Sequence, residues 1–245
     1  MRTDIIERES LGGICLNWGC IPTKALLKSA QVFEYIQHAQ DYGIKIESAE
    51  ADFDSMISRS RNVADGMSKG VNFLMRKNKI DVLKGTGRLM RERKVEVTDA
   101  DGKATTYETK NIIVAVGARA KELPNLPIDG KKIIGYRKAM TLDKQPKRMV
   151  IVGAGAIGVE FAYFYSSIGT EVTIVEFMEQ GLVPREDKDV SKELAKIYKK
   201  KGITVLANTS VESVDTKTKV LKVHVKNRKS GKEDVINCDV VLSAA

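Results

Sequence analysis

Hydrophobic residues recur at helical spacing in two stretches of the first half of the chain. Between Asp52 and Lys79 they return every three or four positions, which places them on one helix face, and Asp52 or Asp54 can cap the N-terminus. A second helix is predicted from Pro22 to about His38, and Ile5 to Glu7 is typical of a strand end before a loop rich in glycine and cysteine. The apolar face of the longer helix contains Met56, Val63, Met67, Val71 and Leu74.

From Ile80 onward the hydrophobic period changes to that of strands. Val95 and Val97 alternate with charged neighbours, residues 99–102 have the composition of a turn, and Thr105 to Tyr107 would form the returning strand. The run from Asn111 to Val116 is continuously apolar, a pattern typical of strands buried on both faces of a parallel sheet. We therefore expect two paired strands followed by a buried strand in this part of the chain.

The second half alternates strands and helices. A strand at Met149–Val152, a glycine turn, a helix to Ser167 and a strand ending at Val175 are followed by a charged helix from Asp187 to Lys201. This order predicts an α/β domain with a hairpin insertion near its end. Residues 120–146 hold three of the five prolines and are the best linker candidate, so the predicted division is 1–119, linker 120–146, and 147–245. The remaining short strands are expected at 203–206, 211–214, 220–225 and 240–242.

The glycine turn carries the first candidate chemistry. Gly153, Gly155 and Gly158 fit the G-x-G-x-x-G pattern directly after a strand and at the head of a helix. Glu176 follows at the end of the next strand, where its carboxylate would bind a free ribose diol and repel a 2′-phosphate. The pattern therefore indicates an NAD site, against the simpler alternative of a glycine turn needed only for packing.

Composition and charge narrow the function classes. The chain has 245 residues, 42% of them hydrophobic, with no apolar stretch long enough to span a bilayer and no leader-like start, so we expect a cytoplasmic protein without a membrane partner. The net charge is +9, but its lysines and arginines are scattered and few aromatics lie among them, so no nucleic-acid partner is expected. Three cysteines argue against a structural disulfide framework.

Two of those cysteines stand in a reactive setting. Cys15 and Cys20 lie five residues apart, close to glycines and at a predicted helix start, with Lys24 nearby. Thiols at a helix N-terminus near a lysine ionise readily, which is what dithiol exchange requires. A zinc site is the alternative, but His38 and His224 lie in unrelated contexts, so we expect no metal site.

The motif Gly-Gly-Ile-Cys-Leu-Asn-Trp-Gly-Cys-Ile-Pro-Thr-Lys at residues 12–24 closely resembles the signature of the flavin-dependent pyridine nucleotide-disulfide oxidoreductases. Together with Gly155–Phe161 it is most similar to the dihydrolipoamide dehydrogenase branch of that family. The resemblance extends over the chain, including residues 85–87, 114–118 and 238–244. It implies two Rossmann-like dinucleotide-binding domains, the first of FAD type and incomplete, the second of NAD type.

The resemblance also implies roles for individual residues. Cys15 would be the interchange thiol, and Cys20 the charge-transfer thiol beside the flavin, the two forming a reversible disulfide. Lys24 would sit near the flavin ring and pair with Glu160. Val116 replaces the threonine usual at its position, which removes one side-chain hydrogen bond. FAD would contact Glu7, Gly12, Gly13, Ile14, Cys15, Lys24, Gly87, Val116, Gly117 and Ala118, and NAD would contact Gly153, Ala154, Gly155, Ala156, Ile157, Gly158, Glu160, Glu176 and, on the adenine side, Val211.

The activity implied is oxidation of protein-bound dihydrolipoamide with reduction of NAD+. The partner would be the lipoyl domain of a 2-oxo acid dehydrogenase or glycine cleavage complex, and the longer parent protein a homodimer. The family's first glycine fingerprint and its histidine motif are not found in this sequence, so we expect the chain alone to be inactive. The alternatives are a glutathione or mercuric reductase-like enzyme, which would favour NADPH, and an inactive nucleotide-binding fragment.

Overall fold

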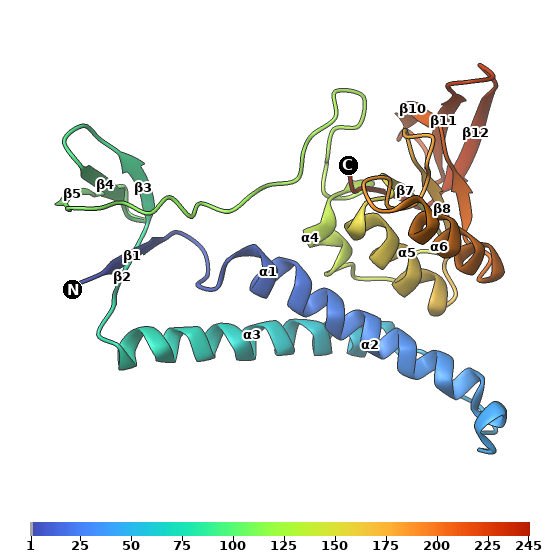
Figure 1. The fold of residues 1–245 in the computed structure, drawn as a ribbon, viewed down its shortest axis with the longest axis horizontal. Helices are drawn as coiled ribbons and strands as arrows, with labels where there is room; N and C mark the ends of the chain where they lie inside the picture. Colours follow the sequence, from blue (N-terminus) through green and yellow to red (C-terminus); the bar gives the residue numbers. More distant parts are fainter. Residues whose placement is uncertain (1) are drawn as a thin grey trace. The chain divides into compact units, whose positions relative to one another are not determined.

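The computed structural model describes residues 2–245, which form two compact units. The first unit contains the chain up to Pro22 and the segment Arg61–Ala118, and the second contains Thr23–Ser60 and Arg119–Ala245. Among residues 2–245 no helix is both long enough and apolar enough to cross a membrane. Each unit is described in turn, with the elements labelled as in Figure 1.

Two long helices pass from one unit to the other. Helix α2 (Cys20–Gln37) begins in the first unit, and helix α3 (Phe53–Lys77) begins in the second. A short 3₁₀ helix, η1 (Ala39–Tyr42), follows α2. Asp52 caps α3, since its carboxylate accepts hydrogen bonds from the backbone N–H and the hydroxyl of Ser55 at 2.9 and 2.6 Å. The predicted helices and the predicted cap are confirmed.

The first unit contains a parallel strand pair and an antiparallel sheet. Strand β1 (Asp4–Glu7) pairs in parallel with β2 (Asp81–Lys84), and the short helix α1 (Gly13–Trp18) follows β1. In the antiparallel sheet the buried residues are Val95 and Val97, as the alternation of apolar and charged residues predicted. The strands of that sheet are β3 (Thr86–Leu89), β4 (Lys94–Thr98) and β5 (Ala104–Glu108).

One prediction in this unit is wrong. Asn111–Val116 forms no strand, and within it Ile113 is 91% exposed and Val116 88% exposed. A buried strand needs hydrogen-bonded neighbours, and no strand among residues 2–245 pairs with this run. Apolar composition by itself therefore did not determine its conformation.

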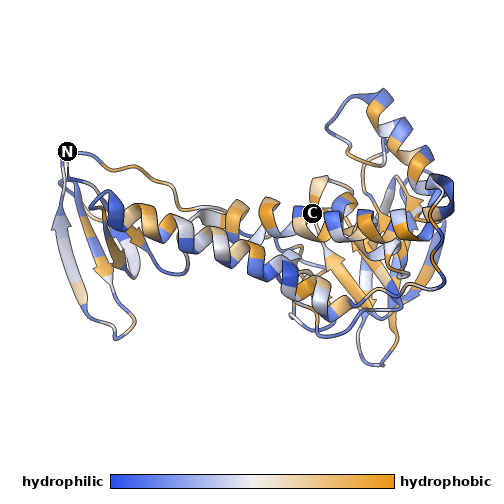
Figure 2. Cartoon of the chain, turned by 90° about the horizontal axis from the view of Figure 1, so that it is seen from below, coloured by the Kyte–Doolittle hydropathy of each residue, from blue (hydrophilic) through white to orange (hydrophobic). Residues whose placement is uncertain are grey.

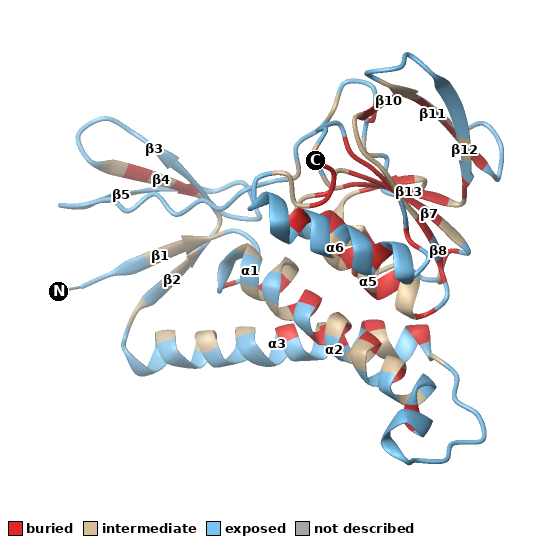
Figure 3. Ribbon diagram, turned by 45° about the vertical axis from the view of Figure 1, so that its right-hand side comes forward, coloured by how far each residue is buried: buried red, intermediate tan, exposed pale blue. Residues whose placement is uncertain are grey.

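The second unit is built on a five-stranded parallel sheet with the order β6-β13-β7-β8-β9. Its strands read as apolar runs because both of their faces are covered, as the hydropathy colouring in Figure 2 and the burial in Figure 3 show. The strands are β6 (Ile133–Ile134), β7 (Arg148–Val152), β8 (Glu171–Val175), β9 (Thr204–Leu206) and β13 (Val240–Ser243).

Alternate residues of these strands supply two separate cores. Met149 and Ile151 of β7 face a core that includes helix α5 (Ala156–Ser167) and parts of α2 and α3. Val150 and Val152 face a second core beneath an antiparallel sheet inserted between β9 and β13. This sheet is the predicted hairpin insertion, with one strand more than expected. Its strands are β10 (Thr209–Asp215), β11 (Leu221–Asn227) and β12 (Glu233–Cys238), and the remaining helices of the unit are α4 (Tyr136–Ala139) and α6 (Lys188–Lys200).

The segment expected as a linker differs from that expectation. Residues 120–146 include β6, which pairs in parallel with β13, and helix α4. Leu126, Ile134 and Ala139 have no exposed surface and contribute to the cores of the second unit. Its prolines therefore do not indicate a connection between domains, because the whole segment belongs to the second unit.

Candidate functional site

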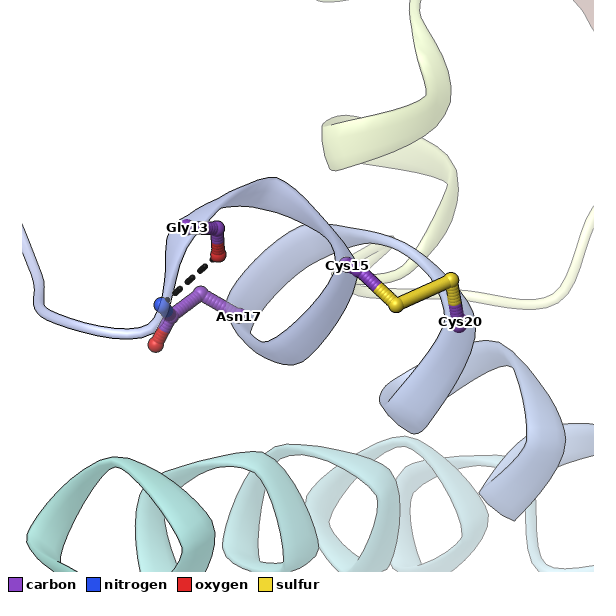
Figure 4. Close-up of a disulfide and its surroundings, with 4 residues drawn as sticks. All are labelled: Gly13, Cys15, Asn17 and Cys20. Atoms are coloured by element: carbon purple, nitrogen blue, oxygen red, sulfur yellow. Dashed lines mark hydrogen bonds between the residues drawn. A yellow bond between two sulfur atoms is a disulfide. The ribbon is translucent and has the colours of Figure 1, made fainter. Parts of the chain in front are cut away.

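Cys15 and Cys20 form a disulfide, which confirms the predicted pairing (Figure 4). Cys15 lies in α1 and Cys20 is the first residue of α2, with their Cα atoms 4.7 Å apart. Both residues are exposed, so a thiol in solution can reach the sulfur atoms. The position of Cys20 at the N-terminus of α2 stabilises negative charge on its sulfur once the bond is opened.

The backbone around the disulfide is held by polar contacts within the first unit. The buried Asn17 side chain donates hydrogen bonds to the carbonyl oxygens of Leu11 and Gly13 at 3.0 and 2.9 Å. The Arg61 guanidinium donates to the Asn17 carbonyl oxygen at 2.6 Å and lies over the Trp18 ring, 4.2 Å from its centre. These contacts fix the helix that presents Cys15.

The residues assigned to FAD in the first unit lie on neighbouring segments. Gly12 and Gly13 have φ values of 103° and 70°, so the chain enters α1 through a left-handed turn that favours glycine. A Cβ atom on Gly117 would lie 3.4 Å from Ile14, so the segment Val116–Ala118 contacts the start of α1. Gly87 likewise lies against β1, which ends at Glu7. The structure thus brings together segments that are far apart in the sequence.

The three glycines of the turn after β7 have three different surroundings. Gly153 has a φ of 105°, and a Cβ on Gly158 would overlap the Gly153 carbonyl oxygen. Around Gly155, by contrast, nothing lies within 4 Å of a Cβ position. A tight turn, an open approach to the backbone and close packing of helix on strand are the requirements of a dinucleotide pyrophosphate cradle, so these residues fit that group. Ala156 and Ile157, at the start of α5, are exposed beside the cradle.

Glu176 connects this turn to the end of β8. Its carboxylate accepts hydrogen bonds from the backbone N–H groups of Ala154 and Met178, each at 2.7 Å. The residue is only 6% exposed, which means that the charge is held at the carboxyl edge of the sheet and not on a mobile side chain. This is the edge at which dinucleotides bind in open α/β sheets.

Two further predicted residues, Val211 on the NAD side and Lys24 on the flavin side, lie in less distinctive places. Val211 is buried in the second core, and its carbonyl oxygen accepts a hydrogen bond from Asn125. Lys24 lines an open pocket of about 390 Å³ with Leu27, Lys28, Gln31 and Tyr163. Among residues 2–245 no ion pair joins Lys24 to Glu160, so that pairing stays a prediction.

The sequence analysis did not predict a cluster of hydrogen-bond donors around the carboxylate of Glu34 in the second unit. Glu34 of α2 accepts hydrogen bonds from Tyr163 at 2.9 Å, from Ser167 at 2.7 Å and from Lys201. Burial alone would raise the pKa of Glu34, but these donors, Lys201 foremost, hold the pKa below its ordinary value. Burial and the Glu34 carboxylate raise the pKa of Tyr163 to about 12. No sequence signal pointed to this cluster, because Glu34 lies 129, 133 and 167 residues from its three partners.

The chain is similar to known proteins over its whole length. The family model described as pyridine nucleotide-disulphide oxidoreductase matches residues 1–245. A dihydrolipoyl dehydrogenase of Zymomonas mobilis is 44% identical over 214 residues, which cover 87% of this chain and 46% of that relative. One of Rhizobium etli is 39% identical and covers all of this chain and 53% of the relative. The chain therefore spans about half the length of the curated relatives it matches.

Solved structures give the same result for the fold. The crystal structure of LpdA from Mycobacterium tuberculosis matches 99% of this chain with a TM-score of 0.87 at 24% identity, and this chain covers 52% of it. An HOCl-induced flavoprotein disulfide reductase, RclA from Escherichia coli, matches the whole chain with a TM-score of 0.81 at 25% identity, with 51% of that protein covered.

Proposed function

The chain belongs to the pyridine nucleotide-disulphide oxidoreductase family, and from this premise we propose that it carries the dithiol-exchange and NAD-binding parts of a flavoprotein that oxidises protein-bound dihydrolipoamide. The observation that carries the proposal is the exposed Cys15–Cys20 disulfide at the head of α2. The glycine cradle with its buried Glu176 is the supporting feature in the second unit.

The proposed exchange needs two thiols of one substrate. A substrate thiolate attacks the sulfur of Cys15, which forms a mixed disulfide and releases Cys20 as a thiolate. The second substrate thiol then attacks the substrate sulfur of the mixed disulfide. This step releases the thiol of Cys15 and forms the substrate disulfide. Two electrons and two protons leave the substrate, and the α2 N-terminus stabilises the thiolate on Cys20.

Two cofactors would complete the reaction. When bound, FAD would accept the electron pair from the dithiol and NAD+ would take it up as hydride. Glu7, the turn at Gly12 and Gly13, and the segment around Gly117 would hold FAD, while the cradle from Gly153 to Gly158 and Glu176 would hold NAD. Glu176 disfavours a 2′-phosphate by its charge, so NADPH-dependent glutathione or mercuric reduction is the weaker proposal.

The partner and the compartment follow from the same proposal. A dithiol that can close into a cyclic disulfide suits exchange with an exposed cystine, so we propose the lipoyl domain of a 2-oxo acid dehydrogenase or glycine cleavage complex as partner, and a homodimeric parent protein. The compartment that we propose is the cytoplasm, the usual location of chains without a structural disulfide framework.

The exchange step is testable on the chain itself by alkylation and mass mapping. We expect Cys15 and Cys20 to be protected in the oxidised chain, and to be alkylated after treatment with dihydrolipoamide more readily than after equal thiol as glutathione. Cys238 is the internal control, because burial raises the pKa of its thiol to about 11 and keeps it unreactive until unfolding.

Two results would contradict the proposal: both thiols free under oxidising conditions, or Cys15 paired with Cys238. Reduction by glutathione as fast as by dihydrolipoamide would favour the glutathione reductase-like alternative. A separate assay of NADH formation from dihydrolipoamide and NAD+, with FAD added, tests whether the chain turns over. We expect exchange without sustained turnover.

A further inference from the structure

A guanidinium group lies on the residue that directly follows Glu176. Arg228 is in the turn between β11 and β12, and its guanidinium carbon lies 3.6 Å from the centre of the Phe177 ring. Its Nη1 also donates a hydrogen bond to the Phe177 carbonyl oxygen at 3.0 Å. The turn of the inserted antiparallel sheet therefore places a positive charge at the carboxyl edge of the parallel sheet.

Several contacts hold this cation in place. The backbone N–H of Arg228 donates to the Asn208 carbonyl oxygen at 2.8 Å, and the Asn208 N–H donates to the Met178 carbonyl oxygen at 3.0 Å. Asn208 itself has a φ of 51°, a left-handed conformation that asparagine tolerates. The two turns are thus joined through Asn208, whose side-chain oxygen also accepts a hydrogen bond from Arg228 Nη1 at 3.5 Å.

The charge on Arg228 has no counterion in the structure. Among residues 2–245 no carboxylate lies within ion-pair distance of it, and its Nε and Nη2 groups donate to no other residue. A guanidinium carries five N–H donors in a planar fork that matches phosphate oxygens. Arg228 is therefore an exposed cation that lies against Phe177 and has free donors and an unbalanced charge.

We propose that Arg228 is a specificity-determining residue of the nucleotide site, and that it supplies a partner for a phosphate on the adenosine ribose. This inference rests on the proposed NAD site at Glu176. The buried Glu176 carboxylate, whose Oε1 accepts the Met178 N–H, sets the preference for a free ribose. Arg228 lies over the ring of Phe177, the residue between Glu176 and Met178. Its positive charge partly offsets the repulsion between Glu176 and a 2′-phosphate. The site therefore retains weak NADPH binding, and its discrimination depends on both charges.

The test measures dissociation constants of NADH and NADPH for the full chain and its variants by fluorescence titration. For Arg228→Ala we expect NADPH binding to weaken about tenfold, the size of one charge-assisted hydrogen bond, with NADH changed less than about twofold. Glu176→Gln removes the charge and should strengthen NADPH binding about tenfold, and the added Arg228→Ala change should abolish that gain. Lys229→Ala, which removes a neighbouring charge of the same turn, should alter neither nucleotide.

Failure of this inference can be distinguished from failure of the proposed NAD site. Equal loss of NADH and NADPH binding in Arg228→Ala, or a Lys229→Ala variant as impaired as Arg228→Ala, overturns the inference and leaves the NAD site standing. Binding of neither nucleotide by the unaltered chain overturns the proposed NAD site and this inference together. Arg228→Lys guards against a disturbed turn: it keeps the charge, so it should bind NADPH more tightly than Arg228→Ala, and failure to do so contradicts an electrostatic role.

Discussion

Gly155 and Gly158 stand three residues apart in one turn, but their surroundings give them opposite tolerances. At Gly158 a methyl group would overlap the Gly153 carbonyl oxygen, which belongs to the backbone and cannot move aside cheaply. At Gly155 the same methyl group meets nothing within 4 Å, and the φ of −69° suits any residue. Only Gly155 leaves a space that a phosphate group could use.

This difference predicts two separable phenotypes. Gly158→Ala should lower the free energy of unfolding by about 1–3 kcal/mol through overpacking. Gly155→Ala should leave it within about 0.5 kcal/mol of the unaltered chain, while NADH binding weakens because the methyl group occupies the phosphate approach. Urea unfolding and NADH titration of both variants measure this. An unaltered NADH affinity in a folded Gly155→Ala variant would argue against the cradle.

At the scale of elements, α2 carries Cys20 at its first turn and is anchored at its other end by the Glu34 cluster. The cluster ties α2 to α5 through Tyr163 and Ser167, and to the end of α6 through Lys201. Lys201 also lies 4.9 Å from the centre of the Tyr163 ring. The Glu34 side chain is 23% exposed, so these charge-assisted bonds are only partly screened by solvent.

The anchor predicts a pH dependence of stability. The pKa of Glu34 is lowered in the folded chain, so its contribution is present above the ordinary carboxyl pKa and is lost as the pH falls through the folded value. Glu34→Gln should therefore destabilise the chain at neutral pH by about 1–2 kcal/mol, and the difference should shrink in acid. Thermal unfolding tests this when it is followed from about pH 8, where carboxyls are ionised, to about pH 3, where they become protonated.

Glu193→Gln is the matched control for this experiment. Glu193 also accepts a hydrogen bond from a lysine, Lys196 at 2.9 Å, but it lies on the exposed face of α6. Its replacement should change stability much less than that of Glu34. Equal effects of the two substitutions would mean that the cluster does not anchor α2.

At the scale of the whole molecule, the two units differ in how completely they cover their apolar residues. In the second unit both faces of the parallel sheet are covered, and Ile151 and Leu242 have no exposed surface. In the first unit the apolar run Asn111–Val116 is exposed and unpaired. Local stability follows buried apolar contacts and backbone hydrogen bonds, so the two units should open at different free energies.

Hydrogen exchange followed by mass spectrometry measures this contrast. Peptides covering Asn111–Val116 should exchange at the rate of an unstructured chain, while peptides of β7 and β13 should be protected up to global unfolding. Adding FAD should slow exchange around Gly117 if the proposed contacts form. Protection of residues 111–116 equal to that of β7, without any addition, would show that the run is paired after all.

Local sequence patterns determined most of the helices and strands of this protein, and they located its two motifs. Helical spacing predicted α2 and α3, and the glycine turn with Glu176 predicted the strand, turn, helix and strand from β7 to β8. These predictions succeed because capping, turn chemistry and periodicity act over a few residues. The family resemblance of residues 12–24 likewise implied the disulfide between Cys15 and Cys20.

Tertiary structure alone decided which residues meet across the chain. The run Asn111–Val116 has the composition of a buried strand and is exposed, because a strand exists only where other strands pair with it. Residues 120–146 contain prolines but supply β6 to the sheet. Glu34 meets Lys201, and Arg228 meets Phe177, over separations of 167 and 51 residues. Such contacts depend on how elements pack, and no local pattern encodes that packing.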